Sequence, residues 1–553
     1  MSVVEVLKFG SSVLRSAADL PIAVDEIYRR WRAGSHILAV VSAFEGVTDQ
    51  LLGELSGVAD LECGEATAAY VSTGEQKTAA LLLGSLRRSG MPSRIVEPRE
   101  IGLIAKGSVL ESAPFSVDES ALRRLWLDYP ILVLPGFYGI DVNGATALFG
   151  RGGSDLSALF LAAELGARCR LIKDVPGVFD SDPARRTTAR RFAALSWSTA
   201  TEVAGPLIQP KALSFAQSRA LAFDVGRPNE NAGTAVGRAD DAWAPRLRTT
   251  TPLRIAIVGC GIVGRGVYES VKRYPGRFEV AQVIVRDVDK YVGVDRVSAD
   301  PSLALAESVD VVIVCIGGVG SAYRLIAAAL QAGKFVITAN KAAVAAHAAA
   351  LAAFTRGDGR RLWYSAAVGG AVPVLETLAA CQAPVREIRG VINGTCGVVL
   401  DAWENGATRC AAVAMAQSAG FAEENPTRDL SGRDSADKLV LLIEAAFQRS
   451  LAPESILTHG IDTIVGDPAG HKLVARARLT PIGIDASIKP EVPLRDSFLG
   501  QARGAENRVE IELTTGKIIR LRGQGAGRWP TTVSVLGDLH EVARSAANVR
   551  ATS

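Results

Sequence analysis

The segment that most constrains the fold is LRIAIVGCGIVGRGVYESV, which begins at residue 253. A hydrophobic run leads into a G-x-G-x-x-G pattern, and residues suited to a helix follow. In a parallel βαβ unit such glycines permit a tight turn, the close approach of a pyrophosphate and close packing of helix on strand. The helix N-terminus also offers oriented N–H donors to phosphates. The segment predicts a Rossmann dinucleotide-binding domain, with cofactor contacts at Gly259, Gly261, Ile262, Val263 and Gly264.

The chain of 553 residues is too long for one hydrophobic core, so we expect more than one domain. A second strand-like run, residues 3–9, opens the chain and leads into a glycine-containing turn. Residues 237–252 are polar, contain proline and lack periodicity, as a linker would. Each side of that linker alternates strand-like runs with amphipathic helical segments, which is typical of parallel sheets. The sequence therefore predicts two α/β parts.

Composition excludes several classes of partner. The net charge is only +3 and no Lys/Arg block occurs, which argues against nucleic acid or an anionic membrane. The seven cysteines form no CxxC pair and the five histidines form no cluster, so neither a disulfide framework nor a protein-held metal is expected. No apolar stretch approaches the ~20 residues of a membrane span, and the N-terminus does not resemble a signal peptide. These features predict a cytoplasmic protein that acts on small molecules.

The second strand of the dinucleotide-binding domain, FEVAQVIV, runs into Arg286 and Asp287. An acidic residue at this place binds the ribose 2′-hydroxyl of NAD, whereas an arginine can pair with the 2′-phosphate of NADP. Arg286 favours NADP and Asp287 keeps NAD as an alternative, while a solvated surface arginine is an equally good interpretation.

Farther along, GKFVITANKAAVAAH places Asn340 and Lys341 directly after a strand, at the expected nicotinamide end. SAAVGGAVPVLETL (365–378) and VINGTCGVVLDAW (391–403) are glycine-bearing turns that lead into helices.

The segment 420–447 carries Glu423, Asp429, Asp434 and Lys438 within a short distance. Asp434 and Lys438 are four residues apart at an apparent helix start, so they share a face. Taken alone, that spacing is more typical of a solvated ion pair than of an active site.

In combination, these motifs resemble the homoserine dehydrogenase family over essentially all of 253–550. The motifs are TANKA, the NGT turn, the GFAE-x-x-P-x-x-D-x-x-G-x-D-x-x-x-K run and GQGAGRWPTTVSVLGDL (523–539). The resemblance implies three sets of residues: the active-site lysines Lys341 and Lys438, the carboxylates Glu423 and Asp434 that hold the substrate's amino group, and the cofactor contacts Asn340, Gly525 and Ala526.

Reduction of an aldehyde needs hydride at carbon and a proton at oxygen, so a cation beside the carbonyl stabilises the developing alkoxide. A desolvated lysine beside a second lysine is expected to have a lowered pKa.

Two positions depart from the family. Ser365 replaces a glutamate that contributes to a monovalent-cation site, and Asn425 replaces a common aspartate.

The first half contains Lys8-Phe-Gly-Ser-Ser, VVSAFEGVTD (40–49), STGEQKTAALLLGSL (72–86), LFGRGGSDLSALFLA (148–162), IKDVPGVFDSDP (172–183) and LIQPKAL (207–213). GRGGSD is a glycine-rich turn that opens a helix, which suits an anionic group, and Lys8 and Lys211 could neutralise phosphoryl charge. The alternative interpretation is that these are ordinary tight turns of an α/β sheet.

Together these segments resemble the aspartate kinase branch of the amino-acid kinase family over about 3–236. The resemblance implies that Lys8 contacts the transferred phosphoryl group, with Asp155 and Lys211 completing the catalytic set. It also implies substrate and ATP contacts at Ser42, Glu75, Arg151, Gly152, Gly153, Ser154 and Asp174.

Three departures bear on activity. The KFGSSV loop is one glycine short, Lys173-Asp174 stands where the family has Thr-Asp, and Gln209-Pro210 stands where it has His-Pro. A shortened phosphate loop displaces donors, which can cost ~10²-fold in rate. Two alternatives to an active aspartate kinase therefore stay open: a catalytically silent scaffold, or enzymes for a related small acid and its semialdehyde.

The resulting hypothesis is a bifunctional enzyme that phosphorylates aspartate with ATP and Mg²⁺ and reduces aspartate semialdehyde with NADPH or NADH. We expect no ACT regulatory module, no inhibition by threonine or lysine through one, and homodimers formed through the dehydrogenase half. The predicted order is an amino-acid kinase fold (αβα sandwich, 1–236), a linker (237–252), a Rossmann domain (253–364), an α+β substrate and dimerisation domain (365–522), and a C-terminal segment that returns to the nucleotide-binding domain (523–553).

Overall fold

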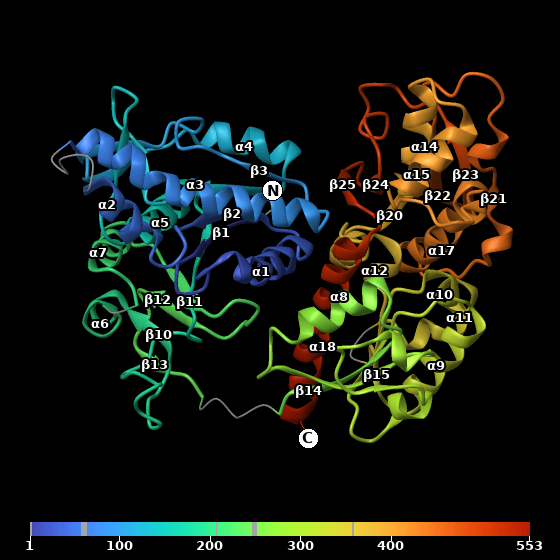
Figure 1. The fold of residues 1–553 in the computed structure, drawn as a ribbon, viewed down its shortest axis with the longest axis horizontal. Helices are drawn as coiled ribbons and strands as arrows, with labels where there is room; N and C mark the ends of the chain where they lie inside the picture. The colour runs from blue at the N-terminus through green and yellow to red at the C-terminus, as the bar shows by residue number, and fades with distance from the viewer. Residues whose placement is uncertain (1–2, 57–62, 206, 246–250, 357–358, 553) are drawn as a thin grey trace. The chain divides into compact units, whose positions relative to one another are not determined.

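The computed structural model describes residues 3–56, 63–205, 207–245, 251–356 and 359–552, and the fold is mixed α/β as predicted. The chain divides into two compact units (Figure 1). The first consists of Met1–Arg88 and Pro92–Thr250, and the second of Ser89–Met91 and Thr251–Ser553. Part of the predicted linker, 246–250, lies outside the described residues.

The first unit is built on one large sheet whose central strands are parallel. Its strands are β1 (Val4–Phe9), β2 (His36–Val41), β3 (Ser93–Ile95), β6 (Ile131–Pro135), β9 (Arg168–Ile172), β10 (Phe192–Ser196), β11 (Phe223–Gly226), β12 (Thr234–Gly237) and β13 (Ala242–Trp243). Their order is β13-β10-β12-β11-β9-β1-β2-β6-β3. The central strands β1, β2 and β6 are buried along almost their whole length, as is typical of a parallel sheet covered by helices on both faces.

The helices of this unit are α1 (Leu20–Arg32), α2 (Val47–Ser56), α3 (Gly64–Arg88), α4 (Glu119–Asp128), α5 (Gly153–Leu165), α6 (Trp197–Val203) and α7 (Pro210–Ser218). A small sheet beside them contains β4 (Ile104–Ser108), β5 (Glu111–Ser116), β7 (Tyr138–Ile140) and β8 (Thr146–Leu148). α5 packs on β1, β2 and β9, which brings its N-terminus to the carboxyl ends of β1 and β9.

The second unit begins with a wholly parallel sheet, in the order β16-β15-β14-β17-β18-β19. Its strands are β14 (Leu253–Val258), β15 (Phe278–Ile284), β16 (Val297–Ser298), β17 (Val311–Val314), β18 (Phe335–Thr338) and β19 (Leu362–Trp363). Its helices are α8 (Ile262–Val271), α9 (Gly320–Gln331), α10 (Lys341–Ala346), α11 (Ala348–Leu351), α12 (Ser365–Val368) and the C-terminal α18 (Arg528–Thr552). Ile255 and Ile257 face α8 and α18, whereas Ala256 and Val258 belong to the core on the opposite face.

A second, mostly antiparallel sheet follows, in the order β21-β23-β22-β20-β24-β25. Its strands are β20 (Val385–Val391), β21 (Leu457–Thr458), β22 (Lys472–Thr480), β23 (Gly483–Glu491), β24 (Glu506–Leu513) and β25 (Ile518–Gln524). The helices of this part are α13 (Val374–Ala380), α14 (Gly394–Glu404), α15 (Arg409–Ser418), α16 (Thr427–Leu430) and α17 (Arg433–Phe447).

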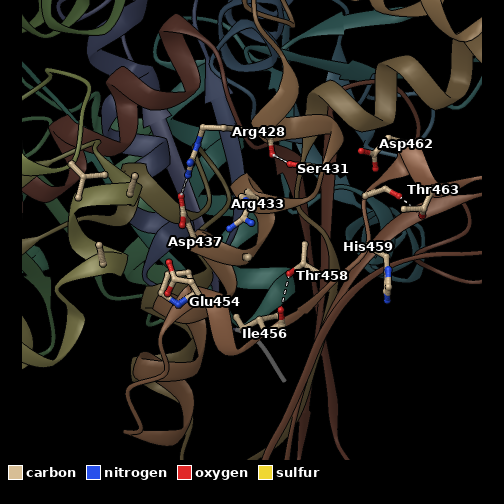
Figure 2. Close-up of a pocket in the computed structure, with 16 residues that line it drawn as sticks. Arg428, Ser431, Arg433, Asp437, Glu454, Ile456, Thr458, His459, Asp462 and Thr463 are labelled. Carbon is tan, nitrogen blue, oxygen red and sulfur yellow. Dashed lines mark hydrogen bonds and ion pairs between the residues drawn. The ribbon is translucent and has the colours of Figure 1, made fainter.

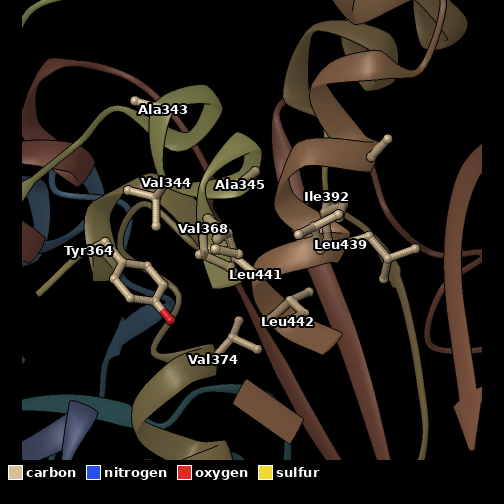
Figure 3. Packing of buried hydrophobic residues seen from close by; sticks show 14 of the residues in the cluster. Ala343, Val344, Ala345, Tyr364, Val368, Val374, Ile392, Leu439, Leu441 and Leu442 are labelled. Carbon is tan, nitrogen blue, oxygen red and sulfur yellow. The ribbon is translucent and has the colours of Figure 1, made fainter. Parts of the chain in front are cut away.

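One continuous core joins the two parts of the second unit (Figure 3). Val344 of α10 and Tyr364 lie in the same buried cluster as Leu439 and Leu442 of α17. Because protein cores are close-packed, this cluster fixes α10 relative to α17. The fold thereby brings together two helix starts that are about ninety residues apart in sequence, at Lys341 and Arg433.

The seven cysteines are all unpaired. Among the described residues, no helix is long and apolar enough to cross a membrane.

Candidate functional site

The glycine turn after β14 has the geometry of a dinucleotide site. Gly259 has a φ of +91°, and a Cβ there would lie 2.9 Å from the Cys315 carbonyl oxygen, while a Cβ on Gly264 would overlap the Gly259 carbonyl oxygen. A Cβ on Gly261 would meet no protein atom within 4 Å. The first and third glycines are therefore required by the protein's own packing, and the second faces open space, which fits the close approach of a pyrophosphate.

The helix behind this turn leaves donors for an anion. α8 begins at Ile262, its N-cap is Gly261, and no side chain caps its first N–H groups. Ile262 is 73% exposed and Val263 is half-buried beside it. The residues present therefore fit a bound dinucleotide.

At the end of β15, Asp287 pairs with Lys290 at 3.1 Å. Arg286 is exposed, and among the described residues no ion pair or hydrogen bond engages its guanidinium. Arg286, and not Asp287, is therefore available to contact a ligand at the end of β15.

The paired lysines meet at one carboxylate. Lys341 Nζ lies 2.7 Å from Asp434 Oδ1, and Lys438 Nζ lies 3.0 Å from Asp434 Oδ2. Lys438 also donates to the Ile392 carbonyl oxygen at 2.8 Å. The Lys438 side chain is 7% exposed and that of Lys341 is 36% exposed, so Lys341 is the lysine nearer solvent.

The charges in this triad depend on each other. Burial disfavours the Asp434 carboxylate, but Lys438 and Lys341 outweigh it and hold the pKa of Asp434 well below its usual range. Burial likewise opposes the Lys341 ammonium, yet Asp434 raises the pKa of Lys341 above its usual value. The prediction of a lowered pKa from an adjacent lysine is wrong for Lys341, because a carboxylate lies between the two cations.

Two further polar residues, Asn393 and Asp429, complete this centre, and neither was predicted as a site residue. The Asn393 side-chain amide donates to Asp434 Oδ2 at 3.0 Å and to Asp429 Oδ1 at 2.7 Å. Its oxygen accepts from the Cys396 amide at 2.8 Å and so caps α14. Burial, with the charge of Asp434, raises the pKa of Asp429. Two sequence features could have identified these residues: the NGT turn, which contains Asn393, and the segment 420–447, which contains Asp429.

Asn340 caps α10 by accepting from the Ala343 amide at 2.9 Å. It also donates to the Ile316 and Gly318 carbonyl oxygens, at 2.9 and 2.7 Å. These contacts tie the start of α10, and thus Lys341, to the loop after β17.

Other predicted residues lie around this centre without contacting it. The Glu423 side chain is exposed, and among the described residues no ion pair engages it. Gly525 is buried, where a Cβ would overlap the Asn507 side chain, and Ala526 is exposed. Asn425 accepts from the Thr427 hydroxyl at 2.6 Å.

Ser365, one of the two positions predicted to depart from the family pattern, has a local role. Its hydroxyl lies 2.6 Å from Glu376 Oε1 and 2.9 Å from Asp538 Oδ1, and its amide donates to Asp538 Oδ2 at 3.1 Å. These contacts tie α12 to α13 and α18.

A cavity of about 510 Å³ lies against another face of α17 (Figure 2). Arg433, Asp437 and Arg428 line it, and Arg428 Nη2 pairs with Asp437 Oδ2 at 2.6 Å. Ala342 of α10 lines the same cavity. None of the predicted site residues lines it, because Lys341, Asp434 and Lys438 project from other faces of α10 and α17.

In the first unit, Asp155 lies between two buried lysines. Lys8 Nζ is 2.8 Å from Asp155 Oδ1, and Lys173 Nζ is 3.0 Å from Asp155 Oδ2. All three side chains are less than a tenth exposed. Burial lowers the pKa of Lys8. At Asp155 burial opposes the charged form, but the two lysines outweigh it and lower the pKa of that carboxyl to about 2.

The loop after β1 lies directly against this charge cluster. A Cβ on Gly10 would lie 2.9 Å from Lys8 Nζ, so the glycine leaves room for the ammonium. Glu75 of α3 is buried. Its Oε1 accepts from the Ala43 amide at 3.0 Å, while Oε2 has no hydrogen-bond partner among the residues that the structure describes. Burial raises the pKa of Glu75 to about 7. Ser42, beside Ala43, is half-buried.

The GRGGSD turn opens α5. Gly152 has a φ of +76° and is the N-cap, Gly153 and Ser154 are the first helical residues, and Arg151 is exposed. Asp174 is exposed, and its carbonyl oxygen accepts from Arg227 Nε at 2.7 Å.

Lys211 lies apart from Asp155. Its ammonium donates to the carbonyl oxygens of Ser112 and Phe149, each at 2.8 Å, and to Glu111 Oε2 at 3.2 Å. Among the described residues, Asp155 pairs with Lys8 and Lys173, and Lys211 is not part of that cluster.

These sites define a chain that joins a nicotinamide-dinucleotide oxidoreductase to a small-molecule kinase domain. Family models for homoserine dehydrogenase match residues 373–540 and, for its NAD-binding domain, residues 259–365. The amino acid kinase family model matches residues 4–220.

Two curated homoserine dehydrogenases are similar to the second unit. That of Corynebacterium glutamicum is 32% identical over 319 residues, which cover 53% of this chain and 72% of the relative. That of Pseudomonas aeruginosa is 33% identical over 318 residues, which cover 53% and 73%. A solved homoserine dehydrogenase from Thiobacillus denitrificans is 28% identical, covering 54% of this chain and 74% of that one, with a TM-score of 0.49. The chain belongs to the homoserine dehydrogenase family and carries an amino acid kinase domain before it.

Proposed function

We propose that the second unit interconverts L-aspartate 4-semialdehyde and L-homoserine. The observation that carries this proposal is the Lys341–Asp434–Lys438 triad on α10 and α17 in a member of this family. Asn340 ties the start of α10 to the Ile316 carbonyl oxygen, and a Cβ on Gly259 of the dinucleotide turn would lie 2.8 Å from the Ile316 side chain. Two cations around one carboxylate leave positive charge beside the place where an alkoxide develops.

The bound nicotinamide supplies the hydride. Lys341, the lysine nearer solvent, donates a hydrogen bond and then a proton to the aldehyde oxygen. Lys438 is held by Asp434 and the Ile392 carbonyl oxygen and adds electrostatic stabilisation. Asp434 and Glu423 receive the substrate's ammonium group, and Asn393 keeps the Asp434 carboxylate in place.

The test is oxidation of NADPH by purified full-length chain with aspartate semialdehyde. Wild type should turn over, and Lys341→Ala should lose about 10²–10³-fold in kcat, the usual cost of removing a donor to a developing oxyanion. Lys517→Ala is the matched control, because Lys517 is an exposed lysine of the same unit. Near-normal turnover by Lys341→Ala would contradict the assignment.

We propose NADP as the preferred cofactor. Asp287 is engaged by Lys290, whereas Arg286 is available for a 2′-phosphate. Arg286→Ala should weaken NADPH binding about tenfold and leave NADH binding unchanged, which corresponds to one lost charge-assisted contact. Equal losses for both cofactors, or none, would contradict this role.

We propose that the first unit phosphorylates L-aspartate with MgATP. Support comes from the buried Lys8–Asp155 pair beside the loop after β1 and from Glu75, whose buried unpartnered oxygen suits a substrate ammonium. ATP fits the glycine turn at the start of α5, and Mg²⁺ would arrive bound to its phosphates. If the unit is a silent scaffold, aspartate will not stimulate ATP consumption; if it serves a related acid, that acid will.

We propose that the enzyme forms homodimers through the dehydrogenase unit. β25 ends the order of its sheet, and edge strands are common places of association. Light scattering should give twice the chain mass, and monomers at assay concentration would contradict the proposal.

A further inference from the structure

The two lysines at Asp155 differ from Lys211 in how many of their N–H donors are in use. An ammonium has three N–H groups. Lys211 has an acceptor for each of them: two carbonyl oxygens and one carboxylate oxygen. Lys8 and Lys173 pair only with Asp155 among the described residues. Most of the donors on these two buried ammoniums therefore have no protein acceptor.

Buried donors and charges are normally satisfied, because leaving them unpaired costs free energy. Two lysines share one carboxylate here. Among the described residues Glu75 is the second carboxyl that acts on Lys8, and burial raises the pKa of Glu75 to about 7. The cluster therefore carries excess positive charge. An anion with several oxygens would supply both the missing charge and the missing acceptors.

The backbone fixes where that anion would lie. β1 and β9 are parallel neighbours, with Phe9 opposite Ile172, so Lys173 follows directly beside Gly10. The Lys173 amide donates to the Gly226 carbonyl oxygen at 2.9 Å, which holds the residue at the sheet edge. The glycine turn that opens α5 ends two residues before Asp155. A phosphoryl group at this edge would meet both lysines and the turn.

We propose that Lys173 is a catalytic residue of the kinase unit, which clamps the transferred phosphoryl group together with Lys8 while Asp155 orients both ammoniums. This inference rests on the proposed kinase function. In the reaction, the bond from the γ-phosphorus to the ADP oxygen breaks and a bond to an acceptor carboxylate oxygen forms, and ADP leaves with the electron pair. The lysines donate hydrogen bonds to the three equatorial oxygens and transfer no proton. Lys211, whose donors are all in use, supports the turn instead.

The test compares Lys173→Met with wild type as full-length chains. Lys173→Met keeps the side-chain length and removes the charge. Lys77→Met is the matched control, because Lys77 is exposed on α3 and pairs with nothing among the described residues. Aspartate-dependent ATP turnover should fall about 10²–10³-fold in kcat, with the KM for aspartate within about threefold of wild type.

A second readout does not depend on turnover. The Mg²⁺ complex of the β,γ-imido analogue of ATP should bind wild type at least about tenfold tighter than MgADP, and Lys173→Met should remove most of that preference. A residue with a purely structural role would change stability and leave this affinity ratio unchanged. If Lys173→Met does not fold, as judged by circular dichroism, Lys173→Gln gives the same comparison.

The outcomes separate the two claims. An unchanged affinity ratio and an unchanged kcat in folded Lys173 variants would overturn the role of Lys173 and leave the kinase proposal standing. A lost ratio in a chain that shows no turnover with any acid would support the phosphoryl clamp and refute the kinase function.

Discussion

At the residue scale, both proposed sites use one carboxylate between two lysines. Asp434 lies between Lys341 and Lys438, and Asp155 lies between Lys8 and Lys173. In each case the carboxylate pairs with both lysines, and at the dehydrogenase site Asp434 raises the pKa of Lys341 despite burial. The carboxylates are therefore expected to matter as much as the lysines.

Asp434→Asn tests this at the dehydrogenase site. Without the Asp434 charge, burial dominates and the pKa of Lys341 falls, so its proton is lost at lower pH than in wild type. We expect kcat to drop about 10²-fold and the alkaline limb of the pH–rate profile to move to lower pH. Asp485→Asn, an exposed aspartate of the same unit, is the control. An unshifted alkaline limb would argue against electrostatic control by Asp434.

Glu75 makes the kinase unit sensitive to pH. Its pKa is raised by burial to about 7, so below that pH the free protein holds it protonated and unable to pair with an ammonium. The KM for aspartate should rise about tenfold per pH unit below pH 7 and level off above it. Glu75→Gln should show a high KM without this slope. Initial-rate measurements from pH 5.5 to about 8.5 would decide, and a flat wild-type profile would refute the role.

At the scale of elements, two glycines in the turn between β14 and α8 have different roles, one in packing and one in cofactor binding. Gly264→Ala places a methyl group against the Gly259 carbonyl oxygen and should destabilise the protein, at a cost of roughly 1–3 kcal/mol for overpacking. Gly261→Ala meets no protein atom, so its melting temperature should match wild type while its cofactor affinity falls at least about tenfold. Thermal melts and NADPH titrations would test the pair. Normal cofactor affinity in Gly261→Ala would contradict the placement of the pyrophosphate.

The arrangement of the elements also explains which features of the sites could be predicted from the sequence. The glycine turn and the Asp434/Lys438 pair are local patterns, so their strand, turn and helix positions were predictable. Asn393 reaches Asp429 of α16 and Asp434 of α17 only because the turn between β20 and α14 lies beside both helices. Lys173 reaches Asp155 only because α5 packs across β1 and β9. Such contacts depend on tertiary packing, which has no signature in local spacing, and the exposed Glu423 shows that a correct motif does not fix side-chain contacts.

At the scale of the whole molecule, the chain joins two units with separate cores. The proposed reactions are not consecutive, since an acyl phosphate must first be reduced to the semialdehyde by another enzyme. We therefore expect the two activities to be separable: Lys8→Ala should remove kinase turnover and keep dehydrogenase turnover within about twofold, and Lys341→Ala should do the reverse. Parallel loss of both activities in either variant would contradict separate sites.

The most direct test of a bifunctional enzyme is aspartate-dependent formation of acyl phosphate, trapped as the hydroxamate by hydroxylamine, in full-length chain with MgATP. The account predicts hydroxamate with wild type and none with Lys8→Ala, from preparations whose semialdehyde-dependent NADPH oxidation is equal. Absence of hydroxamate from wild type with active dehydrogenase would contradict the account and leave the first unit as a scaffold or a kinase for another acid.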